Sequence, residues 1–267
     1  MDHLNQLIVN IFDFNQFVIF LNTIPIEITW IVFLFLCLSI IMILLKIFGE
    51  IGLYIYTIVA IIVANIQVLK IVKFSFFAEP VALGTILFAS IFLCTDILAE
   101  YYGGNSARKN ILISFLGFLS MTIFMLFTIG FKPLDEITAG DNYAWALTLQ
   151  DNLLGVFMPF PIFFLASMIA YLFSQFFDIW FFEKISEFTN KKFLWFRNNF
   201  STIVSSLIDN TIFSVFAWII FNPNPLDFNT VLFTFILGTY FLRIFIALFD
   251  TPFIYLAKYF LPNKHNE

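Results

Sequence analysis

The chain of 267 residues is 61% hydrophobic and only 12% charged, with a mean hydropathy of +0.95 and a formal net charge of −5. Soluble domains carry about a quarter charged residues and lack repeated apolar runs of bilayer length, so this composition excludes a soluble globular protein. It predicts an all-α, polytopic bundle of membrane helices. The net charge says little about partners, because the distribution of Lys and Arg among the loops is what matters.

In chain order, a mixed N-terminal segment precedes seven predicted apolar spans. Residues 1–24 have neither a basic n-region nor a cleavage site, so we interpret them as an interfacial segment rather than a signal peptide. We expect Ser201 and Thr202 to cap the sixth span and the long last span to kink at Pro252. The predicted spans are residues 26–46, 53–72, 81–101, 109–131, 154–182, 201–221 and 229–261.

The basic residues of the predicted loops set the orientation. The two longest connections are a polar loop at 132–152 and a basic loop at 183–200. Three Lys or Arg residues lie on the side of the first loop and nine on the side of the second. By the positive-inside rule, we expect a multi-pass protein of the cell membrane with its N-terminus outside and its C-terminus cytoplasmic.

The stretch at 94–109 is the most distinctive part of the chain. Its predicted span carries Asp96 and Glu100, which are four residues apart and therefore share a helix face. A Gly-Gly pair beginning at Gly103 then ends the helix. Glu100 fits a helix end that meets interfacial water, but Asp96 lies a turn deeper, where a carboxylate needs a cavity or a partner.

Several other polar residues fall inside predicted spans: Asn65, Gln67, Gln175, Asp178, Asp209, Asn210, Arg243 and Asp250. Arg243 lies near mid-membrane and needs a counter-charge, for which Asp96, Asp178 and Asp209 are the candidates. One alternative is a buried ion pair that only fixes helix packing. The excess of acids over this single base favours a function, because a packing pair needs only one carboxylate.

The sequence offers no sign of catalytic or metal chemistry. It contains no HExxH, GxSxG or P-loop motif, so we do not expect an enzyme. His3 and His265 lie at the two ends of the chain, which leaves no set of metal ligands, and we expect no cofactor. Cys37 and Cys94 lie inside apolar runs, so a disulfide framework is not expected.

Two blocks of residues carry a resemblance to a known family. The first block consists of Thr95-Asp96, Glu100, Tyr102-Gly103 and Ala107-Arg108. The second consists of Gln175 and Asp178, a basic aromatic loop at 192–195, Arg197-Asn198, Ser201-Thr202 and Asp209. In this order and spacing they resemble the signature of the queuosine precursor transporter family, also known as the VUT (vitamin uptake transporter) family. Asn65 and Arg243 match further polar positions of that family, and the resemblance covers residues 53–261.

This resemblance implies a transporter core of six spans at 48–262, preceded by an interfacial segment and an extra span at 1–47 and followed by a cytoplasmic tail at 263–267. It implies import of 7-deazapurines such as preQ0, preQ1 or queuine, for salvage into the tRNA base queuosine. The chemistry is compatible, because a guanine-like edge offers donors to a carboxylate and acceptors to Arg, Asn or Gln, and aromatic rings can stack on the base. The expected substrate-binding residues are Asn65, Asp96, Glu100, Gln175, Asp178, Asp209 and Arg243.

Two classes of function stay open at this point. The chain is either a carrier that works alone or the substrate-binding membrane component of a vitamin-type importer that needs an energising partner. A carrier of another small polar heterocycle is a further alternative. We expect the partners to be a small-molecule substrate and the lipid bilayer, without nucleic acid, while a homo-oligomer stays open. Asp96 is either a substrate ligand or a structural counter-ion of Arg243.

Overall fold

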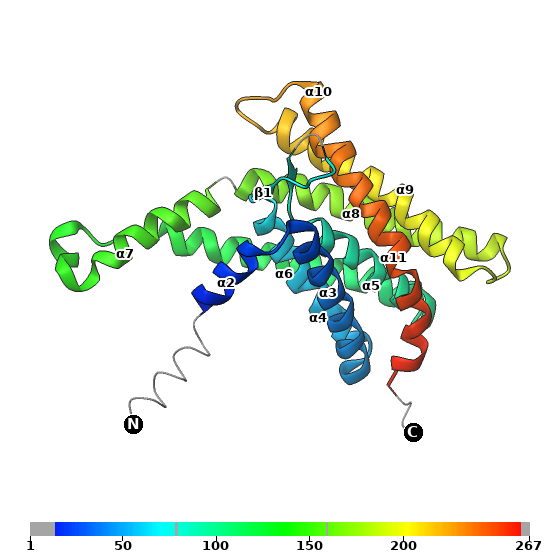
Figure 1. The fold of residues 1–267 in the computed structure, drawn as a ribbon. Helices are drawn as coiled ribbons and strands as arrows, with labels where there is room; N and C mark the ends of the chain where they lie inside the picture. Colours follow the sequence, from blue (N-terminus) through cyan, green and yellow to red (C-terminus); the bar gives the residue numbers. More distant parts are fainter. Residues whose placement is uncertain (1–13, 78–79, 159, 263–267) are drawn as a thin grey trace.

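The computed structural model of the chain describes residues 14–77, 80–158 and 160–262 (Figure 1). Two short strands, β1 (Ile71–Val72) and β2 (Val81–Ala82), pair antiparallel, with Ile71 opposite Ala82. The remaining elements are helical, as the composition predicted. They are α2 (Phe14–Thr23), α3 (Ile26–Phe48), α4 (Glu50–Gln67), α5 (Thr85–Tyr101), α6 (Gly104–Gly130), α7 (Glu136–Phe157), α8 (Phe160–Phe188), α9 (Leu194–Val215), η1 (Phe216–Ile220), α10 (Phe228–Thr230), η2 (Val231–Leu237) and α11 (Gly238–Phe260).

Six helical segments of the described chain are long and apolar enough to cross a membrane, which confirms a polytopic helical membrane protein. They are Ile26–Phe48, Glu50–Gln67, Gly104–Gly130, Glu136–Phe188, Leu194–Ile220 and Phe228–Phe260. The predicted third span corresponds to α5, which has only 17 residues and packs against α3, α4, α6, α8, α9 and α11. A total of seven spans therefore stays a prediction.

Large apolar side chains lie on both the inside and the outside of the bundle. Helix α3 packs against α4, α5 and α11 and contributes Leu38, Ile41 and Leu45 to the core, so it is an integral part of the bundle. Phe124 and Phe233 are among the many large apolar residues that are exposed. A soluble protein would not expose so much apolar surface, whereas a bilayer covers it.

The predicted polar loop at 132–152 is wrong, because most of it belongs to α7. Asp135 caps this helix by accepting a hydrogen bond from the backbone N–H of Thr138 at 2.9 Å. A change of direction inside α7 occurs at Gly140, which has a φ of +47°. The acids, amides and glycine of this stretch suggested a loop, but they fall at a helix cap, at a bend and on an exposed helix surface. In Figure 1, α7 and the adjoining ends of α6 and α8 project away from the other helices.

The predicted basic loop at 183–200 is also much shorter than expected. Helix α8 continues to Phe188 and α9 begins at Leu194, so only residues 189–193 connect them. Ser201 and Thr202 consequently lie in the interior of α9 and do not cap it. We call the end of the bundle that carries this connection the basic end, and the end that carries β1 and β2 the hairpin end.

The last span is nearly continuous but not uniformly α-helical. Its backbone forms π turns in η2, and α11 then runs through Pro252 to Phe260. This departure from regular α-helix lies at η2, well before Pro252, and the kink expected at the proline stays a prediction. At the other end of the chain, the predicted interfacial segment is described only from Phe14, where α2 has no buried residue. Residues 1–13 lie outside the described part.

Candidate functional site

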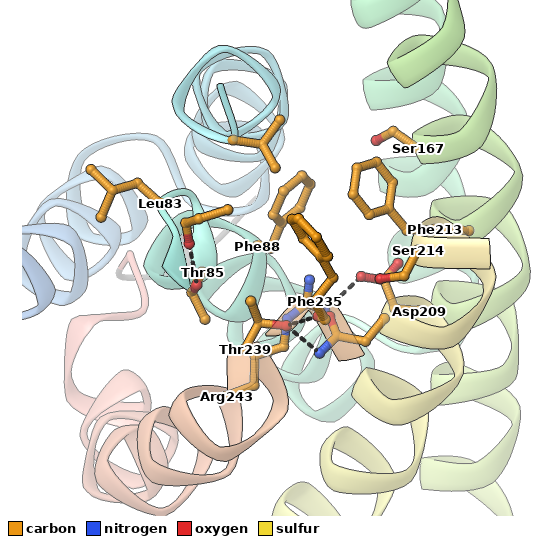
Figure 2. A pocket seen from close by; sticks show the side chains of 14 residues that line it. Leu83, Thr85, Phe88, Ser167, Asp209, Phe213, Ser214, Phe235, Thr239 and Arg243 are labelled. Atoms are coloured by element: carbon orange, nitrogen blue, oxygen red, sulfur yellow. Dashed lines mark hydrogen bonds and ion pairs between the residues drawn. The ribbon is translucent and has the colours of Figure 1, made fainter. Parts of the chain in front are cut away.

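A pocket lies between α5, α8, α9 and the η2–α11 segment, and it reaches toward β2 at the hairpin end (Figure 2). Three aromatic rings line it, those of Phe88, Phe213 and Phe235. Its free volume is about 30 Å³. A space of that size holds one or two water molecules and is too small for a bicyclic base. The polar residues that line it are Thr85, Ser167, Asp209, Asn210, Ser214, Thr239 and Arg243.

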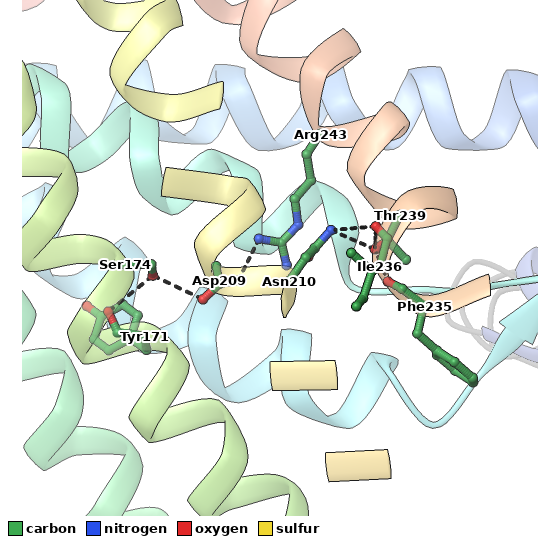
Figure 3. A network of polar contacts seen from close by, with 8 residues as sticks. All are labelled: Tyr171, Ser174, Asp209, Asn210, Phe235, Ile236, Thr239 and Arg243. Carbon is green, nitrogen blue, oxygen red and sulfur yellow. Dashed lines mark hydrogen bonds and ion pairs between the residues drawn. The ribbon is translucent and has the colours of Figure 1, made fainter. Parts of the chain in front are cut away.

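An ion pair forms the floor of this pocket. Nη1 of Arg243 donates to Oδ2 of Asp209 at 2.5 Å, and Oγ of Ser174 donates to the other carboxylate oxygen at 3.0 Å (Figure 3). The guanidinium carbon of Arg243 also lies 5.4 Å from the centre of the Phe88 ring. Arg243 is only 5% exposed, so the predicted need for a counter-charge is confirmed, and Asp209 is the candidate that supplies it. We call Ser174, Asp209 and Arg243 the paired layer.

The amide of Asn210 joins α9 to the wide turns of η2. Its Nδ2 donates to Oγ1 of Thr239 at 2.8 Å and to the carbonyl oxygen of Ile236 at 3.2 Å (Figure 3). π turns inside α-helices are frequently found at functional sites. From the sequence, Asn210 was predicted only as an intramembrane polar residue. Thr239 was not predicted, because a lone threonine in an apolar run is not distinctive.

Three carboxyl groups lie deeper, toward the basic end. Asp96 of α5, Asp178 of α8 and Asp250 of α11 are each at most 2% exposed, and we call them the acid layer. Both Asp96 and Asp250 interact electrostatically with Asp178. Oγ1 of Thr202 donates to Oδ2 of Asp96 at 3.2 Å, and Nδ2 of Asn198 donates to Oδ1 of Asp250 at 3.4 Å. The two carboxylate oxygens of Asp178 have no hydrogen-bond partner among the described residues.

Ion pairs close the bundle at the basic end. Arg197 pairs with Glu100 and lies over the ring of Phe182, and Arg108 pairs with Glu183. Arg197 is 1% exposed and lies inside α9, which corrects its assignment to the loop at 183–200. The pairing joins α9 to α5, two helices that are far apart in the sequence.

A pattern in α9 could have revealed this buried polar face. Its polar residues repeat every four positions in two adjacent rows: Arg197, Ser201, Ser205 and Asp209, and Asn198, Thr202, Ser206 and Asn210. Residues at this spacing share one face of a helix. All eight are buried, so this face of α9 points into the bundle and carries residues of the pocket, the acid layer and the basic end.

The seven predicted site residues do not form a single cluster. Asp209 and Arg243 line the pocket, whereas Asp96 and Asp178 lie in the acid layer. Gln175 belongs to α8, and its Oε1 accepts a hydrogen bond at 2.7 Å from Thr95 of α5.

The other two of the seven have partners elsewhere. Asn65 is buried in α4 and donates to the carbonyl of Ile61 at 2.8 Å. Glu100 pairs with Arg197, as described above. Because Arg243 pairs with Asp209, the interpretation of Asp96 as the counter-ion of Arg243 is wrong.

Most of the chain is similar in sequence to known proteins. The family described as "Putative vitamin uptake transporter" matches residues 82–257. A curated protein of Bacillus subtilis (strain 168), named "Probable queuosine precursor transporter", is 31% identical over 235 residues. That alignment covers 88% of this chain and 95% of the relative. No solved structure matches the chain.

Proposed function

The chain belongs to the putative vitamin uptake transporter family, and on that premise we propose that it is a membrane transporter that imports queuosine precursors. The substrates would be 7-deazapurines such as preQ0, preQ1 or queuine. The name of the Bacillus subtilis relative supports this assignment, because the alignment extends over nearly the whole of both chains. We further propose residues 48–262 as the transport core, against which α3 packs.

The observation that carries the proposal is the pocket that combines the paired layer with aromatic rings. A guanine-like edge presents neighbouring N–H groups that a carboxylate accepts, and O6 and N7 acceptors that a guanidinium satisfies. Asp209 and Arg243 offer these two kinds of group side by side. Phe88, Phe213 and Phe235 offer ring faces on which a planar base can stack.

The small volume of the pocket implies a moving part. A free space of about 30 Å³ does not admit a base, so substrate entry requires the helices around the pocket to separate. The pocket reaches toward the hairpin end, whereas the ion pairs of Arg197 and Arg108 hold the basic end together. We propose that the pocket opens first at the hairpin end, which the orientation below places outside the cell.

A salvage experiment tests the assignment. Cells that cannot make queuosine precursors should regain queuosine in their tRNA from external precursor only when this chain is expressed. Replacing Arg243 with Lys should reduce this salvage by about one to two orders of magnitude, because Lys keeps the charge but not the planar, forked donor geometry. Glu187→Gln is a matched control, since Glu187 forms an exposed pair with Lys184 away from the pocket. If tRNA queuosine stays absent for all three precursors with the protein present in the membrane, the substrate assignment is wrong.

We also propose that the protein resides in the cell membrane with its basic end and C-terminus in the cytoplasm. The excess of Lys and Arg at that end supports this orientation. A Lys192→Cys variant tests it, because Lys192 is exposed in the α8–α9 connection and both native cysteines are buried. An impermeant thiol reagent should not label this variant in intact cells and should label it after lysis. Labelling from outside would reverse the orientation.

Transport in liposomes separates a carrier that works alone from a binding component that needs an energising partner. We expect the purified full-length chain to exchange labelled precursor across the membrane by itself. Binding of precursor without any exchange would instead favour the binding component.

A further inference from the structure

Beyond the substrate pocket, we propose that the acid layer binds a proton and couples the import of the precursor to the entry of that proton. The inference rests on the proposed carrier function, but it concerns different residues, Asp96, Asp178 and Asp250. These three carboxyl groups are buried, the buried bases pair with other acids, and several carboxylate oxygens have no donor.

The acid layer has no basic partner among the described residues. Among the described residues, the buried positive charges are those of Arg197 and Arg243. Arg197 pairs with Glu100, and Arg243 pairs with Asp209. Three ionised carboxylates that interact electrostatically and are buried away from water would repel one another and lose their hydration. A cation must therefore neutralise part of this charge.

The layer also contains too many hydrogen-bond acceptors. Both oxygens of Asp178 and Oδ1 of Asp96 are buried without a partner. Asn198 independently indicates that the layer lacks a donor. Its Nδ2 donates to Asp250, while its own Oδ1 is buried without a hydrogen-bond partner. An ionised carboxylate only accepts hydrogen bonds, whereas a protonated one also donates. A bound proton supplies both the charge and the donor that the layer lacks.

The surroundings of Asp178 favour a proton over a metal ion. Helix α5 presents Asp96 and α11 presents Asp250. Helix α9 presents the hydroxyls of Ser201 and Ser205, which lie near Asp178 but donate to the backbone carbonyls of Asn198 and Ser201. Across the described residues, no three His, Cys, Asp or Glu side chains converge closely enough to hold a metal ion. A proton needs only one carboxyl oxygen, so this looser arrangement suffices for it.

Helix α8 connects the acid layer to the pocket. Asp178 lies one turn from Ser174 on the same face, and Ser174 donates to Asp209 in the paired layer. A substrate that draws Asp209 away from Ser174 or Arg243 therefore acts on the same turn of α8 that carries Asp178. The same turn of α8 therefore takes part both in substrate binding in the pocket and in protonation of the acid layer.

The proposed step is a simple proton transfer. The ionised carboxylate of Asp178 takes up one proton from the outer solution and becomes a neutral carboxylic acid while the precursor occupies the pocket. After the bundle opens at the basic end, the acid releases the same proton to the cytoplasm and becomes a carboxylate again. One proton enters with each precursor, and no bond of the precursor changes.

The test uses the full-length protein in liposomes and preQ0, the precursor that carries no amino side arm and is uncharged. With an interior more alkaline by one pH unit and no membrane potential, the wild-type protein should accumulate preQ0 about tenfold, because one proton per substrate transmits the full tenfold gradient. A pH-sensitive dye inside should report acidification that depends on preQ0. Exchange of preQ0 at equal pH without any effect of the gradient would overturn the proton coupling while leaving the transport function intact. Absence of exchange would instead count against the transport function.

A substitution assigns the effect to the acid layer. The Asp178→Asn protein should keep its thermal stability and should still exchange preQ0 at equal pH. It should lose the tenfold accumulation that the pH gradient drives. Asp227→Asn is the matched control, because Asp227 is an exposed helix cap and Asn also caps well. Retained accumulation in a folded Asp178→Asn protein would sink the assignment, and Asp250→Asn answers the same question if the first variant does not fold.

Infrared difference spectra provide a readout that needs no substrate. The wild-type protein should gain the carbonyl stretch of a buried carboxylic acid when the pH is lowered, and Asp178→Asn should lack part of this signal. An identical signal in the two proteins would contradict the proposal even if transport fails in both.

Discussion

The paired layer and the acid layer lie close to each other in the same bundle and are both built from buried carboxylates, yet they are held in opposite ways. Asp209 has a base at 2.5 Å and a hydroxyl donor at 3.0 Å. Asp178 has no base among the described residues, and the neighbouring hydroxyls of Ser201 and Ser205 donate to backbone carbonyls instead. The difference shows that burial of an acid does not by itself reveal its role, because the same residue type serves as half of an ion pair in one layer and as an unpaired acceptor in the next.

The energetic consequences of the two layers also differ. Breaking a buried pair leaves a charge without compensation, so the paired layer should be sensitive to any change in one partner. Neutralising an unpaired acid removes a cost of burial, so the acid layer should tolerate neutral substitutes. Four substitutions with decreasing expected effects on stability test that contrast.

The largest effect is expected from Arg243→Met. This change leaves Asp209 buried without its base and should lower the free energy of unfolding by about 3–5 kcal/mol. Thermal unfolding in detergent, together with precursor binding, measures it, and binding should be lost. The double variant that also changes Asp209 to Leu should recover most of the stability but not the binding. An unchanged melting temperature in the single variant would remove the distinction between the two layers.

A smaller effect is expected from Gly84→Ala at the hairpin end. Gly84 has a φ of +98°, and an added Cβ would lie 2.8 Å from the carbonyl oxygen of Ala64. The strain should cost about 1–3 kcal/mol and shift α5 relative to α4 beside the pocket. The rate of precursor uptake should fall, whereas the number of protons that enter with each precursor should stay the same. Gly103→Ala is the comparison, since Gly103 also has a positive φ but no atom within 4 Å of an added Cβ. Equal losses of uptake in both variants would show that backbone strain alone is responsible.

A still smaller effect is expected from Thr202→Val beside the acid layer. The substitution keeps the shape of the side chain and removes the hydroxyl that donates to Asp96 at 3.2 Å. We expect a loss of about 0.5–1.5 kcal/mol in unfolding free energy, the usual net value of one hydrogen bond. Thermal unfolding checks this value. A loss comparable to that of Arg243→Met would mean that the acid layer is held as tightly as the paired layer.

The smallest effect on stability is expected from Asp96→Asn, although its effect on function should be large. Asn keeps an oxygen that can accept from Thr202 and adds N–H donors beside Asp178, so the unfolding free energy should change by less than about 0.5 kcal/mol. Exchange of precursor at equal pH should continue, and accumulation driven by a pH gradient should fall. Loss of precursor binding would instead make Asp96 a substrate ligand, as the sequence first suggested.

Local patterns in the sequence were sufficient to predict the class of the protein and most of its helices. Hydropathy over about 20 residues reports whether a segment can cross a bilayer, and this property does not depend on the rest of the fold. The need of Arg243 for an acid followed in the same way, because a lone base in hydrocarbon is costly wherever it lies. The polar residues of 132–152 and 183–200 were misleading, since a loop and an exposed helix surface or buried polar stripe can share the same composition.

What the sequence could not determine is which residues meet. Asp209 and Arg243 are 34 positions apart and Glu100 and Arg197 are 97 apart, so their pairing depends on how α5, α9 and α11 pack. Three acids were equally good candidates for Arg243 until the helices were placed in space. The pocket, the π turns of η2 and the unpartnered oxygens of Asp178 likewise follow from contacts between helices. A sequence lists the charges of each helix, but the distances that decide which charges neutralise one another exist only in the folded bundle.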